Sequence, residues 1–344
     1  MRWWLLLVVA ACGNSSSSAT DAASGEVAIE APAETWTWIP IDGTQCGNGA
    51  PTGIGVNLTT RSDRVMIFLQ GGGACWDANT CFVLKSSVNI ESGYNQQSFT
   101  TEIGQIGSAW VWQRNAQNPF RDASWIYVPY CTGDLHDGTR TASYDVGGTP
   151  KTVAHVGSLN LDKILARVHA TKPTADVIWL GGLSAGAYGV GFNLAKTRAV
   201  WPNAQVHGLA DSSPLITVEA TRWQAMQTQW AMVFPTGCTG CSSDLGTMPA
   251  ALRAEMPQGT RYGLLSNTRD NVIATYFGIT QDQLQTALTA EVAAMSNGQA
   301  AFQINGTGHV LIGMPAAMTS TGVTEQAWVT QWATGDAAWS SVGP

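Results

Sequence analysis

Charged side chains are scarce in this chain of 344 residues. Asp, Glu, Lys and Arg together make up 12% of the sequence, which is about half of their usual share in globular domains. Lys and Arg number 17 against 24 Asp and Glu, so the formal net charge is −7 at pH 7. Proteins that bind nucleic acids neutralise phosphates with clustered basic side chains. The composition therefore excludes a nucleic-acid partner.

The sequence also has no apolar run long enough to cross a membrane as a helix, which takes about 20 residues. The run at residues 3–11 follows Arg2 and is typical of the hydrophobic part of a secretory signal. The small residues before Cys12 resemble a bacterial lipoprotein signal. We expect residues 1–11 to be the signal peptide and a lipid on Cys12 to anchor the exported protein to the periplasmic or cell-surface face of a bacterial membrane. A plain signal peptide cleaved near Ala11, which would leave a secreted protein, is the alternative.

The segment after Cys12 is polar and rich in serine and alanine. This composition is typical of a flexible linker, so we expect a tether over residues 12–35. The remaining residues, 36–344, are long enough for one large domain. The hydrophobic share of the whole chain, 44%, is sufficient for a core.

No motif for a metal or a nucleotide is complete. Cys238 and Cys241 have the spacing of half a zinc site, but no second Cys/His pair at ligand spacing follows them. The triplet Gly71–Gly73 lacks the Gly-Lys-Ser/Thr ending of a phosphate-binding loop. We therefore expect neither a metal nor a cofactor.

The cysteines favour disulfides. With Cys12 set aside, six of the seven cysteines remain, an even number in a chain that we expect to be exported. The short-range pairs Cys75–Cys81 and Cys238–Cys241 are favoured, which leaves Cys46 for Cys131. The spacing alone does not choose among the possible pairings.

Short apolar runs stand apart along the chain, at residues 64–69, 124–129, 177–181, 205–210, 262–266 and 301–304. Each run is nearly continuous, as expected of parallel strands that are buried on both faces. Helix-compatible segments lie between the runs, at residues 156–169, 187–198, 217–232, 268–277 and 281–296. This alternation predicts an α/β fold with a mostly parallel sheet and helices on both faces. The connection at 213–258 is long, and we expect it to form a cap or insertion over the site.

The most informative motif is Gly182-Leu183-Ser184-Ala185-Gly186, which lies between a predicted strand and a predicted helix. This context is that of a nucleophile elbow, a sharp turn that projects a serine hydroxyl from the edge of a sheet. The glycines leave room for the turn, and the N-terminus of the helix can stabilise an oxyanion. We expect Ser184 to be a nucleophile. An ordinary serine at a helix N-cap is the alternative.

A serine nucleophile needs a histidine base and an acid that orients it, in the chain order Ser, Asp/Glu, His for this kind of elbow. His309 is the last histidine and follows a flexible, glycine-bearing loop after the final strand, so we expect it to be the general base. Asp270, just after the strand at 262–266, is the favoured acid. Asp211, at the end of the preceding strand, is the alternative acid.

An oxyanion hole needs backbone N–H donors on both sides of the reacting carbonyl. The elbow supplies the N–H of Ala185. The glycines that follow the strand at 64–69 can turn further N–H groups toward the substrate, as in the glycine-rich motif of lipases and esterases. We expect Gly72 and Gly73 to complete the oxyanion hole.

These motifs resemble the pectin acetylesterase/Notum family. The resemblance covers about residues 42–313 and is carried by the elbow and by three further segments, Gln70-Gly71-Gly72-Gly73-Ala74-Cys75-Trp76, Val128-Pro129-Tyr130-Cys131-Thr132-Gly133-Asp134-Leu135-His136 and Cys46-Gly47-Asn48-Gly49-Ala50-Pro51. It implies an α/β-hydrolase-like carboxylesterase without a cofactor, and it supports Asp270 as the acid. The sequence departs from the family in having Ala74 where a tryptophan is usual and no cysteine close to His309. These departures indicate a distant, bacterial branch.

Asp134 and His136 lie within one of these segments. Two ligands make a poor metal site, so we expect the pair to hold the shape of the site by hydrogen bonding. A direct catalytic role is the alternative.

The sequence thus predicts an exported serine carboxylesterase that acts on an ester substrate. Acetylated polysaccharide is the leading substrate. The alternatives are a lipase-like or polyester-cleaving hydrolase and a non-catalytic, glycan-binding surface lipoprotein. The length of the acyl chain, the alcohol moiety and the oligomeric state stay open.

The expected cap has one apolar face, because Trp223, Met226 and Trp230 recur at helical spacing. This face packs on the sheet or lines the pocket over Ser184. In the second case a change at Trp230 would alter the preference for the acyl group.

Overall fold

The computed structural model describes residues 27–344. The expected signal peptide and the expected lipidation site at Cys12 lie outside the described residues. Within the described part of the chain, no helix has both the length and the apolar character needed to cross a bilayer.

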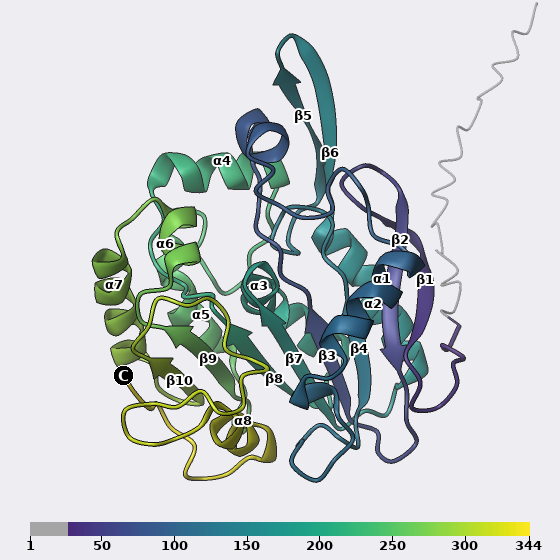
Figure 1. Cartoon of the computed structure of the whole chain (residues 1–344), viewed down its shortest axis with the longest axis vertical. Helices are drawn as coiled ribbons and strands as arrows, with labels where there is room; N and C mark the ends of the chain where they lie inside the picture. The colour runs from purple at the N-terminus through teal and green to yellow at the C-terminus, as the bar shows by residue number, and fades with distance from the viewer. Residues whose placement is uncertain (1–26) are drawn as a thin grey trace, which may run out of the picture.

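An eight-stranded sheet runs through the centre of the molecule (Figure 1), in the order β1-β2-β4-β3-β7-β8-β9-β10. Its strands are β1 (Thr37–Gln45), β2 (Pro51–Asn57), β3 (Val65–Leu69), β4 (Ser124–Val128), β7 (Val177–Leu183), β8 (Gln205–Asp211), β9 (Tyr262–Asn267) and β10 (Gln299–Ile304). β2 pairs antiparallel with β1 and with β4. The pairs from β4 to β10 are parallel. This mostly parallel sheet confirms the predicted α/β fold.

Both faces of the sheet are apolar, which explains the continuous apolar runs. In β3, Val65, Ile67 and Leu69 pack in one hydrophobic cluster, whereas Met66 and Phe68 pack in another. Successive side chains of a strand point to opposite faces, so each cluster covers one face. Helices α2 (Gly157–Thr171) and α3 (Ala185–Val200) contribute to the first cluster. Helices α1 (Gln96–Ile106) and α8 (Glu325–Thr334) contribute to the second.

The parallel strands bring the candidate residues to one edge of the sheet. β3 leads into the glycine triplet, β7 into Ser184 and β8 ends at Asp211. β9 leads into Asp270 at the start of α6 (Asn271–Phe277), and β10 leads into the loop that carries His309. Carboxyl ends of neighbouring parallel strands meet at the same edge, where α/β proteins place their sites.

The segment at 213–258 forms helix α4 (Ala220–Trp230), a 3₁₀ turn at Leu245–Thr247 and helix α5 (Met248–Glu255). Figure 1 shows α4 on the same side of the sheet as α6. Helix α4 also contacts a hairpin formed by β5 (Arg140–Val146) and β6 (Thr149–His155), which was not predicted from the sequence. Helix α7 (Gln281–Ala294) follows α6, close to the position predicted for it.

The expected tether, residues 12–35, extends too far toward the C-terminus, because its last residues belong to the folded domain. Ile29 is buried, and its backbone N–H donates to Thr171 Oγ1 of α2 (2.9 Å). The carboxylate of Glu34 binds the guanidinium of Arg61, with 2.6 Å between Oε1 and Nε. Residues 27–35 therefore pack on the domain, because an apolar side chain and an ion pair fix them there.

Three disulfides join Cys46 to Cys131, Cys75 to Cys81, and Cys238 to Cys241. These are the pairs favoured from the sequence. The first ties the end of β1 to the segment after β4, the second closes the loop after the glycine triplet, and the third lies beyond α4.

Candidate active site

Ser184 occupies the sharp turn between β7 and α3. Its backbone has φ 52° and ψ −120°, a conformation that is costly for a residue with a Cβ atom. The turn is tight: a Cβ on Gly182 would lie 2.5 Å from the backbone of Gly186, and a Cβ on Gly186 would overlap the carbonyl of Leu69. The side chain of Ser184 caps no helix and lines a pocket. The tight turn and the side chain that caps no helix fit the expected nucleophile elbow.

Asp270 and His309 form a hydrogen-bonded pair. The carboxylate of Asp270 is fully buried, and its Oδ2 lies 2.7 Å from His309 Nδ1. Its Oδ1 accepts the backbone N–H groups of Val272 (2.9 Å) and Ile273 (3.0 Å) at the start of α6. The helix cap thus holds the carboxylate in place, and the carboxylate fixes the imidazole so that Nε2 is the nitrogen left for proton transfer.

Asp211, the alternative acid, hydrogen-bonds to Ser212 and to the loop after His309 rather than to the imidazole. Its Oδ2 accepts the backbone N–H groups of Leu311 (2.7 Å) and Ile312 (2.6 Å), and its Oδ1 accepts the hydroxyl of Ser212 (3.0 Å). Burial raises the pKa of this carboxyl to about 6. Asp211 therefore holds the loop that follows His309, whereas Asp270 holds the imidazole.

The end of β8 joins the elbow to this loop. The N–H of Ser184 donates to the carbonyl of Asp211 (2.7 Å), and the N–H of Val310 donates to Ser212 Oγ (3.0 Å). Among residues 27–344, no hydrogen bond joins Ser184 Oγ to His309. These backbone contacts bring the turn of Ser184 and the loop of His309 to the same edge of the sheet.

The glycine triplet lies beside the elbow. Gly72 and Gly73 have φ values of 147° and 77°, a region of backbone conformation that favours glycine. In the described part of the chain, no hydrogen bond outside regular secondary structure uses the N–H of either residue. Gly73 and Ala185 line the same pocket as Ser184. The N–H of Ala185 belongs to the first turn of α3, where it has no partner within the helix.

Asp134 and His136 are buried and hydrogen-bonded, His136 to the residue that precedes the glycine triplet. Asp134 accepts hydrogen bonds from Thr132 Oγ1 (2.6 Å) and from the N–H of Gly157 (2.7 Å). His136 Nε2 lies 2.9 Å from the carbonyl of Gln70. Burial lowers the pKa of His136 to about 4, so the ring is neutral at pH 7 and donates through Nε2. The contacts of both residues are structural, as the sequence led us to expect.

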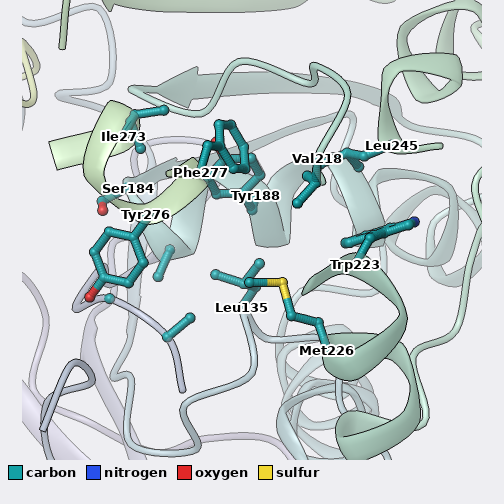
Figure 2. A pocket seen from close by; sticks show the side chains of 13 residues that line it. Leu135, Ser184, Tyr188, Val218, Trp223, Met226, Leu245, Ile273, Tyr276 and Phe277 are labelled. Atoms are coloured by element: carbon teal, nitrogen blue, oxygen red, sulfur yellow. The ribbon is translucent and has the colours of Figure 1, made fainter. Parts of the chain in front are cut away.

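An apolar pocket with about 480 Å³ of empty space opens beside Ser184. Figure 2 shows Ser184 and Tyr276 at one end and Val218, Trp223, Met226 and Leu245 at the other. The sequence suggested Trp223 and Met226 as possible lining residues. It missed the contribution of α6, which supplies Ile273, Tyr276 and Phe277.

Trp230 does not have the pocket-lining role considered for it. Its side chain is fully buried, and Nε1 donates to the carbonyl of Cys75 (2.8 Å). The apolar face of α4 therefore divides: Trp223 and Met226 line the pocket, whereas Trp230 belongs to the core.

A cluster of Cys75, Cys81 and His155 has the proximity of metal ligands, with all three ligand atoms within 4.8 Å of one another. Both sulfurs are joined in a disulfide, and both nitrogens of His155 have hydrogen-bond partners, Tyr144 Oη and the carbonyl of Thr132. The two sulfurs are bonded to each other and the imidazole is hydrogen-bonded at both nitrogens, so none of the three groups is free to bind an ion.

A parallel sheet with helices on both faces, a strained serine between strand and helix, and a buried Asp–His pair at the same edge together define the α/β-hydrolase type of fold and site. The family model described as Pectinacetylesterase matches residues 37–241. The chain therefore belongs to the pectinacetylesterase family.

The relatives found by sequence include Notum proteins. The palmitoleoyl-protein carboxylesterase NOTUM of Mus musculus is 27% identical over 175 residues, which are 48% of this chain and 33% of that protein. The palmitoleoyl-protein carboxylesterase notum2 of Xenopus laevis is 29% identical over 176 residues, 48% of this chain and 34% of that protein. The matched part thus spans about a third of the relatives' length.

The fold resembles a solved structure described as the Wnt deacylase Notum from Drosophila. The TM-score is 0.65 at 16% sequence identity, and the match covers 90% of this chain and 98% of that one. At this identity the likeness concerns the fold, which is α/β-hydrolase-like as the sequence predicted.

Proposed function

We propose that this protein is a serine carboxylesterase. The observation that carries the proposal is the buried Asp270–His309 pair at the same edge of the sheet as the strained turn of Ser184. The likeness to the pectinacetylesterase family supports it. Ser184 is the nucleophile, His309 the base and Asp270 the acid that orients it.

In the proposed mechanism His309 Nε2 takes the proton of Ser184 Oγ as the oxygen attacks the ester carbonyl. The N–H groups of Gly72, Gly73 and Ala185 stabilise the oxyanion that forms. His309 then gives the proton to the leaving alcohol, and an acyl group stays on Ser184. A water molecule activated by His309 releases the acid and restores the serine.

The leading substrate is an acetylated polysaccharide, because the family model is described as that of a pectinacetylesterase. An assay with the acetate, butyrate and palmitate esters of 4-nitrophenol tests the activity. Hydrolysis of at least one ester separates an enzyme from the rival, a glycan-binding surface lipoprotein. No turnover of any of the three would contradict the proposal.

One observation favours a second candidate, a lipase-like or polyester-cleaving hydrolase. The pocket beside Ser184 is lined almost entirely by apolar side chains, and its lining extends to Trp223 and Met226 of α4 (Figure 2). Buried apolar surface stabilises a longer acyl chain by about 0.8 kcal/mol per CH₂.

Met226→Trp tests this second candidate. Met226 lies at the far end of the pocket from Ser184, so a larger side chain should shorten the pocket without touching the triad. We expect hydrolysis of the 4-nitrophenyl hexanoate to fall about tenfold relative to the acetate, equivalent to roughly 1.4 kcal/mol. An unchanged ratio of the two rates would mean that the acyl chain binds elsewhere.

Trp230→Ala is the matched control on the same helix. Because Trp230 is core, its truncation should cost about 3–5 kcal/mol of stability and leave the ratio of hexanoate to acetate hydrolysis unchanged. Thermal unfolding and the same two assays measure both effects.

Export and the lipid anchor belong to this proposal as well. They rest on the sequence before residue 27 and on three disulfides, which are typical of exported proteins. Cys12→Ser should move the protein from the membrane fraction to the soluble fraction of bacterial cells. If the unchanged protein is soluble and carries no acyl chain, the anchor does not exist and the protein is secreted or periplasmic.

A further inference from the structure

A second cleft lies on the other side of the glycine triplet from the apolar pocket. It is a depression that is wide open to solvent. Gln70 and Gly71 line one side, and α1 lines another with Gln97, Ser98, Thr101 and Gln105. Because Gln97, Thr101 and Gln105 are four residues apart in turn, they lie on one face of the helix.

This cleft begins next to the nucleophile. A Cβ placed on Gly71 would lie 3.1 Å from the Cβ of Ser184. Gly71 lines the cleft, whereas Gly73 lines the apolar pocket, and Gly72 lies between them. An ester bound at Ser184 with its acyl chain in the apolar pocket thus has the cleft available for its alcohol.

The cleft combines amide and hydroxyl side chains with apolar groups such as Val88, and it is nearly free of charge. An amide side chain both donates and accepts hydrogen bonds, as a sugar hydroxyl does. Among the described residues, the side chain of Gln105 makes no hydrogen bond, and Gln97 makes a long one to Thr101 Oγ1 (3.5 Å). Both amides are therefore available to a ligand.

The one carboxylate of the cleft, Glu102, is occupied. Its Oε1 accepts Gln70 Nε2 (2.6 Å) and the hydroxyl of Tyr127 (2.8 Å), and its Oε2 accepts the hydroxyl of Tyr94 (2.5 Å). No Lys, Arg or His is among the lining residues of the described chain. The cleft thus has nothing to pair with an acidic group, and the net charge of −7 repels one.

We infer that this cleft binds the alcohol part of the ester, and that this alcohol is a neutral, polyhydroxylated group such as an uncharged sugar. The inference rests on the proposed function and narrows its substrate. Gln97 and Gln105 determine specificity by hydrogen bonding to hydroxyl groups. An acidic sugar is a poorer match for the cleft, because the lining offers no cation to pair with its carboxylate.

The test compares butyrate esters that share the acyl group and differ in the alcohol. These are the esters of 4-nitrophenol, of the 3-hydroxyl of methyl glucoside, of the 3-hydroxyl of methyl glucuronoside with its carboxyl group free, and of serine in a short neutral peptide. The variants are Gln97→Ala with Gln105→Ala, and the control is Gln96→Ala, an exposed glutamine of α1 that does not line the cleft.

We expect the double variant to lower kcat/KM for the glucoside ester about tenfold, mainly through KM, since each hydrogen bond contributes about 0.5–1.5 kcal/mol. The rate with the nitrophenyl ester should stay within about twofold, and the control should change neither. The glucuronate ester should be the poorer sugar substrate.

Other outcomes overturn the inference. An equal loss on the glucoside and nitrophenyl esters, or no loss on either, would mean that α1 does not bind the alcohol. If the enzyme preferred the glucuronate ester and the double variant abolished this preference, the cleft would bind an acidic sugar. If the same held for the serine ester, the cleft would bind a protein. Absence of hydrolysis of every ester would contradict the proposed function itself, which the nitrophenyl ester reports separately.

Discussion

Replacing Ser184 with alanine should abolish ester hydrolysis and leave the fold intact. Loss of the nucleophile in other serine hydrolases lowers turnover by about 10⁴–10⁶-fold. The same loss is expected here, because the oxyanion donors and the pocket cannot replace the attacking oxygen. The measurement is turnover of 4-nitrophenyl butyrate by the purified variant.

The fold of this variant should be unchanged for a local reason. Ser184 has φ 52°, and alanine has the same Cβ atom, so the strain of the turn stays as it is. The melting temperature should therefore move by only a few degrees. If the folded variant kept a tenth of the turnover, another residue would be the nucleophile.

Asp270→Asn should have the second largest effect. Asparagine retains an oxygen that can cap α6, so the helix should stay in place. The carboxylate that faces His309 Nδ1 is lost, and the amide that replaces it no longer holds the tautomer with the proton on Nδ1. The equivalent change in a serine protease lowers kcat by about 10⁴-fold, and we expect a loss of that order in turnover of 4-nitrophenyl butyrate.

Asp211→Asn is the matched control for this prediction. Asp211 contacts the backbone of Leu311 and Ile312 rather than the imidazole, so the change weakens the loop beyond His309. Loss of one such hydrogen bond costs about 1–3 kcal/mol, so even if all of it appeared in the barrier, turnover would fall by about fivefold to 160-fold. If Asp211→Asn were the more damaging of the two folded variants, the acid of the triad would be Asp211.

The preference for Asp270 over Asp211 illustrates what a sequence leaves open. Both carboxylates follow a strand, and both lie between Ser184 and His309 in the chain. Their roles depend on the direction in which each side chain points at the edge of the sheet. Asp211 is the last residue of β8, whereas Asp270 begins a helix three residues beyond β9, and only the folded loop from 305 to 312 shows which one faces the imidazole.

The sequence alone was sufficient for the parallel part of the sheet. Six strands were predicted because each is buried on both faces and is therefore apolar at consecutive positions. The elbow could be predicted because its sterics require small residues at Gly182 and Gly186 around the serine. These are local constraints, and local constraints are visible in a linear pattern.

Elements with one exposed face were missed. β5 alternates buried and exposed residues, and its partner β6 is exposed over its first half. The two strands stabilise each other by pairing as a hairpin. Their polar residues interrupt the continuous apolar run by which a buried strand is predicted. β1 is similarly exposed for much of its length and pairs antiparallel with β2. Such strands depend on pairing more than on burial. The Gly147-Gly148 turn between β5 and β6, with both residues at positive φ, is a local hairpin signal that a search for continuous apolar runs does not use.

The sequence by itself determined the class of fold, the serine at its turn and the residues from which the Asp–His pair is drawn, and it favoured the disulfide pairs without fixing them. Only the tertiary structure decided which acid meets His309, and only it separated Trp223 and Met226 in the pocket from Trp230 in the core. It also placed the apolar pocket and the polar cleft on opposite sides of the glycine triplet. The physical reason is that strand and turn propensities act between neighbours in the chain, whereas a pocket is the space left between segments whose distance in the sequence says nothing about their contact.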